Sequence, residues 1–275
     1  MLRDKILSRL EEMGAAPDHQ RVAEEVLGIR GAPPELARRL VAQALVVEDR
    51  RDAWRRAGER ICRHAPAAAG VYVLKDAGGR ALYVGKAVNL RRRLRAHFAA
   101  RRWRAVKPAF SRVVDAEWQP VGSELEALLR EAELIAQLQP VVNVQTGAPS
   151  LATRGIPASL HRDVLVLVPS VEVDSIELVA ARAGGEWTMQ RTRRNGADLA
   201  VHTQRLMRFF KSPLRDRAGS APSPLAPIVF SWLSHRGAAA TRVDPHDARD
   251  ARELRKRLAA LLRDERLFRE RLHQC

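Results

Sequence analysis

The sequence of 275 residues predicts an α+β fold in three parts: a helical N-terminal segment, a central sheet flanked by helices, and a small α/β C-terminal domain. Three observations support this prediction. Apolar residues recur at spacings of three to five through residues 1–60, which is a helical period. Residues 70–86 alternate as two strands around a glycine-rich turn. Strand patterns start again after residue 150, so we expect parts at 1–62, 63–148 and 149–275.

The first part is nearly neutral, because residues 1–60 hold 12 basic and 11 acidic side chains. Pro17 and the stretch 31–34 interrupt its helices. Mixed charges of this kind are typical of a solvated helical surface. We therefore expect a small helical unit and assign no chemistry to it.

The central sheet begins with a predicted β-hairpin. Its strands read GVYVLKD and ALYVGK, and residues 77–80 form the turn between them. Residues 111–121 are expected to add a third strand. Between these strands, Asn89 is a suitable N-cap for a short basic helix over 90–98. Ser123 and Glu126 form a capping box that opens a further helix to about Leu138, before Pro140.

The C-terminal part starts with predicted strands at 163–170 and 176–183, and Gly184 and Gly185 turn the chain into EWTMQ. A helix is expected over 197–210, a Pro/Ser/Ala-rich loop over 212–227, and an amphipathic helix or pair of helices from about Asp247. Residues 151–275 hold 22 basic and 14 acidic side chains. DNA binding and plain packing are both open as roles for this part.

The charge distribution points to a polyanionic partner. The formal net charge is +16, and no acidic residue occurs in the 38 positions between Asp76 and Asp115. Eleven basic residues lie in that stretch: Arg80, Lys86, Arg91, Arg92, Arg93, Arg95, Arg101, Arg102, Arg104, Lys107 and Arg112. A solvated helix face normally mixes both signs, so this stretch predicts a phosphate-binding surface. Compositional bias and an anionic membrane surface are the alternatives.

Several classes of protein are excluded by composition. The longest apolar runs fall well short of the roughly 20 residues that span a bilayer. The charged start MLRDKILSRLEEM does not resemble a signal peptide. Two cysteines, Cys62 and Cys275, are too few for a disulfide scaffold. We expect a soluble, cytoplasmic protein without a membrane partner.

The candidate chemistry begins with the tyrosines, since the only two, Tyr72 and Tyr83, both lie in the hairpin. Alternation places them on one face with Gly85. On the following helix, Arg93 and His97 are four residues apart and share a face. Aromatic core packing is the alternative interpretation of the tyrosine pair.

An acid enters from the helix that follows Ser123. On a helical wheel Glu131 falls inside an apolar arc, between Leu138 and Ile135, whereas Glu126 and Glu133 fall on the solvent side. A carboxylate on an apolar face is costly unless a cation, a hydrogen-bond network or a metal compensates it. The alternative is a salt-bridged glutamate at the margin of the core.

These motifs together resemble a known family. GVY at 70–72, YVGK at 83–86, NLRRRLRAHF at 89–98, Glu131 and Asn143 are similar in kind and order to the GIY-YIG nuclease superfamily. Within it, residues of about 66–147 look most like the subgroup of UvrC N-terminal domains and the shorter Cho. The resemblance implies a three-stranded antiparallel sheet flanked by helices, and phosphodiester cleavage with one divalent cation, Mg²⁺ or Mn²⁺.

The resemblance also implies roles for individual residues. Glu131 is expected to bind the metal, and Tyr83, with Tyr72 beside it, to accept a proton from the attacking water. A free tyrosine has a pKa near 10, so nearby cations must lower it, and Lys86 and Arg93 are the candidates. Asn143 is expected to orient site groups by hydrogen bonding, and Gly85 to let the backbone approach the substrate. Further phosphate contacts are expected from Arg91, Arg92, Arg95, Arg101, Arg102 and Lys107.

One position departs from the subgroup, because His97 stands where a tyrosine is usual. We expect His97 to keep the hydrogen bond of that tyrosine, to act as an alternative base, or to fill space. The implied activity is an endonuclease on duplex or branched DNA, in repair incision, with a repair protein as partner. Other features of longer UvrC chains are not found, so a single-cut or stand-alone nuclease is expected. The alternative is a non-cleaving nucleic-acid-binding protein that uses the fold as a scaffold.

Overall fold

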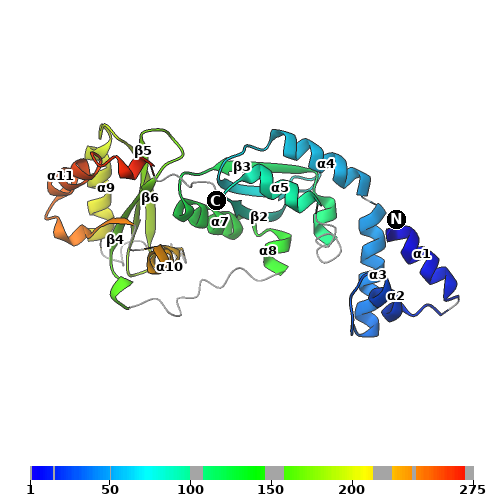
Figure 1. Cartoon of the computed structure of the whole chain (residues 1–275). Coiled ribbons are helices and arrows are strands. Elements are labelled where there is room, and N and C mark those ends of the chain that lie inside the picture. Colours follow the sequence, from blue (N-terminus) through cyan, green and yellow to red (C-terminus); the bar gives the residue numbers. More distant parts are fainter. Residues whose placement is uncertain are drawn as a thin grey trace.

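The computed structural model describes residues 2–14, 16–49, 51–99, 108–145, 158–212, 225–236 and 240–269. Helices at the N-terminus, a central sheet and a second, C-terminal sheet follow one another along the molecule (Figure 1). This arrangement confirms the predicted α+β fold with its helical N-terminal segment. None of the helices in these ranges has the length and apolar character needed to cross a bilayer.

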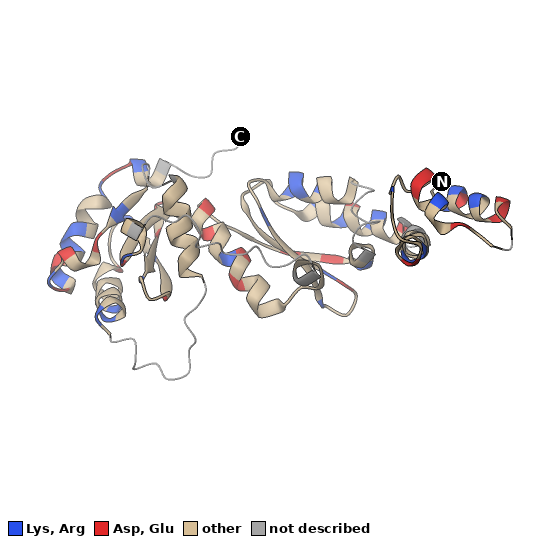
Figure 2. Cartoon of the chain, turned by 90° about the horizontal axis from the view of Figure 1, so that it is seen from below, with Lys and Arg blue, Asp and Glu red and all other residues tan. Residues whose placement is uncertain are grey.

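The N-terminal helices are α1 (Leu2–Glu12), α2 (His19–Glu25) and α3 (Pro34–Asp49). They enclose a small core of Ile6, Val22, Val41 and Ala44. The Asp18 side chain accepts the amides of the first turn of α2 and caps that helix. Basic and acidic residues alternate over these helices (Figure 2), as their near-neutral composition predicts.

The next helix, α4 (Arg51–His64), belongs to the core of the central sheet. Trp54 and Ile61 share a hydrophobic cluster with Tyr72 of the hairpin, and the Trp54 indole donates to the carbonyl of Phe98 at 3.3 Å. This cluster contains residues from both sides of the predicted domain boundary at residue 62. The boundary itself stays a prediction.

The central sheet consists of β1 (Gly70–Lys75), β2 (Ala81–Ala87) and β3 (Asp115–Pro120), antiparallel and in the order β2-β1-β3. Tyr72 pairs with Gly85 and Leu74 with Tyr83, as the alternation predicts. The third strand is shorter than the predicted 111–121, because the short helix η1 (Pro108–Arg112) occupies the start of that segment.

Two helical layers cover this sheet (Figure 1), α4 and α5 (Leu90–Ala99) on one side and α7 (Glu124–Leu138) on the other. The short helix α8 (Val141–Gln145) packs at the edge strand β2, and its Val142 joins the core cluster of α4 and α5. The predicted caps are present. Asn89 Oδ1 accepts the amide of Arg92 at 2.9 Å, and Ser123 Oγ accepts the amide of Glu126 at 3.1 Å. Gln139, in the left-handed conformation with φ 44°, ends α7 just before Pro140.

The C-terminal sheet is antiparallel in the order β6-β5-β4-β7. Its strands are β4 (Val164–Pro169), β5 (Ser175–Ala181), β6 (Trp187–Arg193) and β7 (Thr241–Val243), and the short helix η2 (Ala158–Leu160) precedes them. One face packs against α9 (Leu199–Lys211) and α11 (Ala251–Leu261), with η4 (Pro245–Asp247) and α12 (Arg266–Arg269) nearby. The first two strands and both long helices match the predicted segments, and β6 begins in the EWTMQ segment that follows the predicted turn.

In the C-terminal part, the helix α10 (Ala226–Arg236) and the strand β7 were not predicted. Much of α10 is apolar and buried, so its sequence shows no one-sided stripe that would mark a surface helix. The predicted loop over 212–227 is wrong at its end, because Ala226 already begins α10. Residues 213–224 of that loop lie outside the described ranges.

The helix α7 packs against both sheets. Leu125 and Leu129 join the cluster formed by the C-terminal sheet and α10, whereas Ile135 packs against Val73 and Val84 of the central sheet. The prediction that Glu126 faces solvent is therefore wrong. Its side chain lies on the part of α7 that the C-terminal domain covers, and Glu126 is only 1% exposed.

This burial gives a pH-dependent prediction for Glu126. Burial raises the pKa of its carboxyl group above the ordinary value, and the nearby Glu177 raises it further. An acid whose pKa is higher in the folded than in the unfolded chain costs stability once the pH rises through the unfolded and then the folded value. We expect Glu126→Gln to raise the Tm by about 2–4 °C near pH 7.5, and to change it little near pH 4.

Thermal unfolding followed by circular dichroism at both pH values tests this expectation. Glu133→Gln is the matched control, because Glu133 lies on the same helix but is partly exposed and paired with Arg130 at 2.8 Å. A gain of equal size at both pH values, or a loss near neutral pH, would contradict the assigned cause.

Candidate active site

The predicted site residues meet around β2, which is an edge strand of the central sheet. Successive side chains of a strand point to opposite faces. Tyr83 and Gly85 therefore face α5, which carries Arg93 and His97, whereas Lys86 faces α7, which carries Glu131. The groups approach the strand from both of its faces.

Tyr72 is the buried centre of the tyrosine face. It is 0% exposed, and its hydroxyl hydrogen-bonds Nε2 of His97 at 2.5 Å. His97 is itself 4% exposed and stacks on the ring of Phe110. Burial, and then the neighbouring Tyr83, raise the pKa of Tyr72 far above its ordinary value, so this phenol stays protonated. His97 thus makes a hydrogen bond to Tyr72, and its three expected roles stay predictions.

Tyr83 is only partly buried and lies at the outer side of the pair, its ring centroid 6.0 Å from that of Tyr72. Burial raises the pKa of Tyr83, and the Glu131 carboxylate raises it further. The Arg93 guanidinium and a hydrogen bond with Tyr72 lower it. Arg93 thus acts on this pKa in the predicted direction, although burial outweighs it.

Lys86 has a different partner from the one expected. Its Nζ lies 3.4 Å from Oε2 of Glu131, with the two side chains 38% and 19% exposed. The cost of placing Glu131 on a largely apolar helix face is thus met by a cation on β2. Both side chains remain open to solvent and to an incoming group.

The donor set at Glu131 restricts which metal this site would hold. Within the described ranges, no group of three or more His, Cys, Asp or Glu side chains could bind a metal ion together. A cation here would take one carboxylate oxygen from Glu131 and its other ligands from water and phosphate. Mg²⁺ accepts such a set, because it keeps several waters and favours oxygen ligands. The residues present therefore fit a single hard divalent cation.

Asn143 acts on the main chain of β2. Its Oδ1 accepts the amide of Val84 at 2.8 Å, and its Nδ2 donates to the carbonyl of Val84 at 3.0 Å. Asn143 is 8% exposed, so both bonds are shielded from water. These bonds hold the main chain of the residue between Tyr83 and Gly85, and the orienting role of Asn143 stays a prediction.

Gly85 is required for a reason other than the predicted one. A Cβ at this position would lie 2.7 Å from the Tyr72 hydroxyl and 2.8 Å from Cε1 of Tyr83. Contacts this short do not occur for real Cβ atoms. The absent side chain leaves room for the two phenol rings, and approach of the substrate to the backbone stays a prediction.

The arginines of α5 divide into two groups. Arg91 Nε donates to the carbonyl of Ala65 at 2.7 Å and so ties α5 to the end of α4. Arg92, Arg93 and Arg95 are exposed on the same helix. The other predicted phosphate contacts, Arg101, Arg102 and Lys107, lie outside the described residues.

Sequence reasoning missed two features of this site. The pairing of Asn143 with the main chain of Val84 has no signal in the sequence, because the two residues are 59 positions apart. The buried environment of Glu126 was also missed. The only sequence signal for this burial was the strand pattern that starts after residue 150. That pattern predicts a second sheet, and a second sheet needs a helix such as α7 to cover its apolar face.

Comparisons with known proteins agree with the motifs. The family model of the UvrC-like GIY-YIG domain matches residues 68–144. UvrABC system protein C of Desulforudis audaxviator is 42% identical over 82 residues, which cover 30% of this chain and 13% of that protein. The protein of the same name from Syntrophus aciditrophicus is 46% identical over 81 residues, 29% of this chain and 13% of the relative. The chain thus spans a small part of the length of these relatives.

Among solved structures, the chain is similar to the GIY-YIG N-terminal endonuclease domain of UvrC from Thermotoga maritima, crystallised with magnesium as its catalytic divalent cation. The identity is 30%, the match covers 31% of this chain and 94% of that chain, and the TM-score is 0.28. The motifs, the sheet order and the family model agree on the same residues. Residues 68–144 of this chain therefore form a UvrC-like GIY-YIG domain of the GIY-YIG nuclease superfamily.

Proposed function

We propose that this chain is a divalent-metal-dependent endonuclease that hydrolyses DNA phosphodiesters, in an incision step of DNA repair. One observation supports the proposal above the others. A tyrosine with its hydrogen-bonded partners, Tyr83, Tyr72 and His97, lies around the same edge strand as the pair of Lys86 and Glu131. A protein that only bound nucleic acid would need the exposed arginines of α5 but not this cluster.

Glu131 is the residue that would hold the cation, Mg²⁺ or Mn²⁺. Bound there, the metal would stabilise negative charge on the scissile phosphate and on the leaving 3′ oxygen. Lys86, 3.4 Å from the carboxylate, adds a second positive charge on the same side of β2. Arg93 is exposed, and its guanidinium, which also hydrogen-bonds Tyr72 and Tyr83, suits a bidentate contact with phosphate.

Tyr83 is the proposed general base. Its partly exposed hydroxyl can accept a proton from an attacking water, and Arg93 stabilises the phenolate that results. Tyr72 stays protonated beside it, and His97 fixes the Tyr72 hydroxyl. The hydrogen bond between His97 and Tyr72 thereby holds Tyr72, the hydrogen-bonding partner of Tyr83, in one orientation.

The partners follow from the same proposal. The acid-free stretch and the exposed Arg92 and Arg95 suit the phosphates of a DNA duplex or branch. The matched relatives are named as part of a UvrABC system, so we propose a repair protein as a further partner, in the cytoplasm. The C-terminal domain stays a candidate for additional DNA contact.

The first test concerns Glu131. We expect Glu131→Gln to lower the rate of nicking of supercoiled plasmid in Mg²⁺ or Mn²⁺ by about 100-fold or more, because a neutral amide is a poor ligand for a hard cation. Glu133→Gln, two positions further on the same helix, is expected to keep wild-type activity. Equal rates for wild type and Glu131→Gln would refute the assignment of the ligand.

The second test concerns Tyr83. Tyr83→Phe removes the hydroxyl and keeps the ring, so we expect kcat to fall by about 10²–10⁴-fold, the usual contribution of general-base catalysis. The Kd for DNA, measured by fluorescence anisotropy in Ca²⁺, should be unchanged. A loss of affinity without a loss of kcat would assign Tyr83 to substrate binding, and absence of nicking by the wild type would favour a non-cleaving protein.

A further inference from the structure

In the turn between β3 and α7, Gly122 packs against the main chain of the C-terminal domain. A Cβ on Gly122 would lie 2.1 Å from the carbonyl carbon of Ser170 and 2.4 Å from the carbonyl oxygen of Pro169. Both of these atoms belong to the main chain at the end of β4, so they cannot move aside as a flexible side chain would. Only glycine fits between the two domains at this point.

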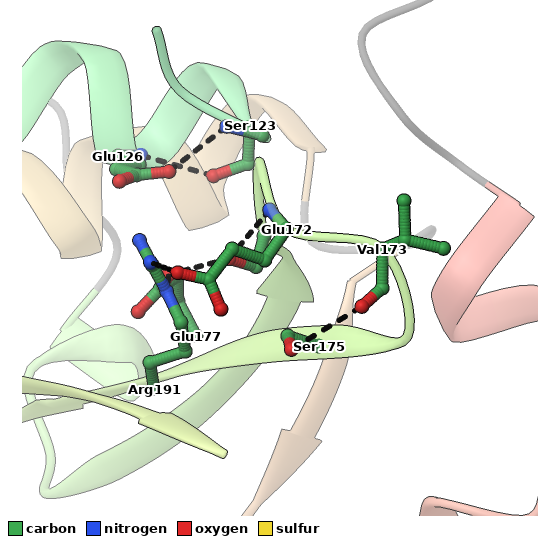
Figure 3. A network of polar contacts seen from close by, with 9 residues as sticks. Ser123, Glu126, Glu172, Val173, Ser175, Glu177 and Arg191 are labelled. Atoms are coloured by element: carbon green, nitrogen blue, oxygen red, sulfur yellow. Dashed lines mark hydrogen bonds and ion pairs between the residues drawn. The ribbon is translucent and has the colours of Figure 1, made fainter. Parts of the chain in front are cut away.

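One turn into α7, Glu126 fixes the start of the helix. Its Oε2 accepts the amide of Gly122 at 2.9 Å, and its own amide donates to Ser123 Oγ at 3.1 Å. Ser123 and Glu126 are 6% and 1% exposed. In Figure 3 these residues lie above the polar cluster of the C-terminal sheet. The capping box is thus buried by the second domain.

The opposing side is a polar network that is buried at Ser170 and Glu177 and partly exposed at Arg191 (Figure 3). Ser170 Oγ donates to Glu177 Oε1 at 2.8 Å, and Arg191 Nε donates to the same oxygen at 2.6 Å. Arg191 also pairs with Glu172. Ser170 and Glu177 are 1% and 2% exposed, and the charges of Glu177 and Arg191 both act on the pKa of Glu126. Ser170 and Glu177 are thus shielded from water, whereas the side chains of Arg191 and Glu172 are 35% and 57% exposed.

Apolar packing extends this contact along the first half of α7. Leu125 and Leu129 are both 0% exposed within the cluster of the C-terminal sheet and α10. The Trp232 indole of α10 donates to Glu124 Oε2 at 3.4 Å. Ala127, Leu134 and Ile135 on another flank of α7 pack against the central sheet, and Glu131 lies near the middle of the helix.

We propose that Gly122, Glu126, Ser170, Glu177 and Arg191 form an interdomain joint whose role is to position Glu131. An α-helix rises about 1.5 Å per residue, so Glu131 lies only about 7.5 Å along the axis from Glu126. A helix moves as a stiff body over that length. The joint therefore sets the position of the Glu131 carboxylate along the helix axis relative to Lys86. The C-terminal domain thereby contributes to the site without supplying a ligand. The inference rests on the proposed function, in which Glu131 binds the metal.

The main test is Gly122→Ala in the full chain, with Gly78→Ala as the matched control. The added methyl group forces the two main chains apart at residue 122, whereas at Gly78 the nearest atom is a side-chain oxygen 3.5 Å away. A displacement of about 1 Å in a reacting group can cost about 100-fold in rate. We expect kcat for plasmid nicking to fall by about that factor in Gly122→Ala, with KM unchanged, and Gly78→Ala to match the wild type.

A second measurement does not depend on catalysis. Hydrogen exchange followed by mass spectrometry reports the order of the backbone along α7. In Gly122→Ala we expect faster exchange in peptides covering residues 131–138, beyond the altered turn, whereas exchange in β1 should remain that of the wild type. Exchange changes confined to residues 122–126 would overturn the proposal.

A third variant pair separates positioning from simple folding. Glu126→Ala removes the bond to the Gly122 amide, so it should lower kcat and speed exchange in the same peptides. Glu126→Gln keeps an acceptor for that amide and should restore both. Failure of Gln to restore them, or wild-type kcat in Glu126→Ala, would refute the joint. If wild-type protein does not nick DNA, the proposed function fails, and the exchange data alone then decide whether the joint exists.

Discussion

The double packing of α7 is the constraint on which the rest of the structure depends. One flank of this helix completes the core of the C-terminal sheet through Leu125 and Leu129. The other flank completes the central sheet through Ile135, which contacts Val73 and Val84. Each sheet would leave an apolar face in water without it. Because both cores use the same helix, a carboxylate on α7 has a defined place relative to the two domains.

The site itself divides into a buried and an accessible half. Tyr72 and His97 are almost fully buried and satisfy each other by hydrogen bonding, as buried polar groups must. Tyr83, Arg93 and Glu131 are open enough to meet a substrate. The opposing influences of Glu131 and Arg93 on the pKa of Tyr83 place all three in one electrostatic environment. Rigid support and reactive groups are thus supplied by different residues of the same short segments.

Much of the fold could be predicted because its signals are local. The hairpin register follows from alternation, and the caps at Asn89 and Ser123 follow from hydrogen bonds within one turn. The apolar arc that singled out Glu131 failed for Glu126, because a helical wheel assumes a single packing partner and α7 has two. The helix α10 escaped prediction for a related reason: a helix buried on most sides shows no polar stripe. The actual neighbours of Gly85 and Lys86 depend on side-chain placement, which spacing alone does not give.

The pairing of Asn143 with Val84 has a consequence for how the domain meets other molecules. An edge strand presents unpaired amides and carbonyls, which invite another chain to extend the sheet. A site built around an edge strand can be reached by a bulky duplex, but the same strand is open to unwanted pairing with a strand of another chain. Here one carboxamide makes both hydrogen bonds at Val84 that a neighbouring strand would make there. The middle of the strand is thereby closed to β-sheet extension by another chain, while Tyr83 and Lys86, on its two faces, remain partly exposed.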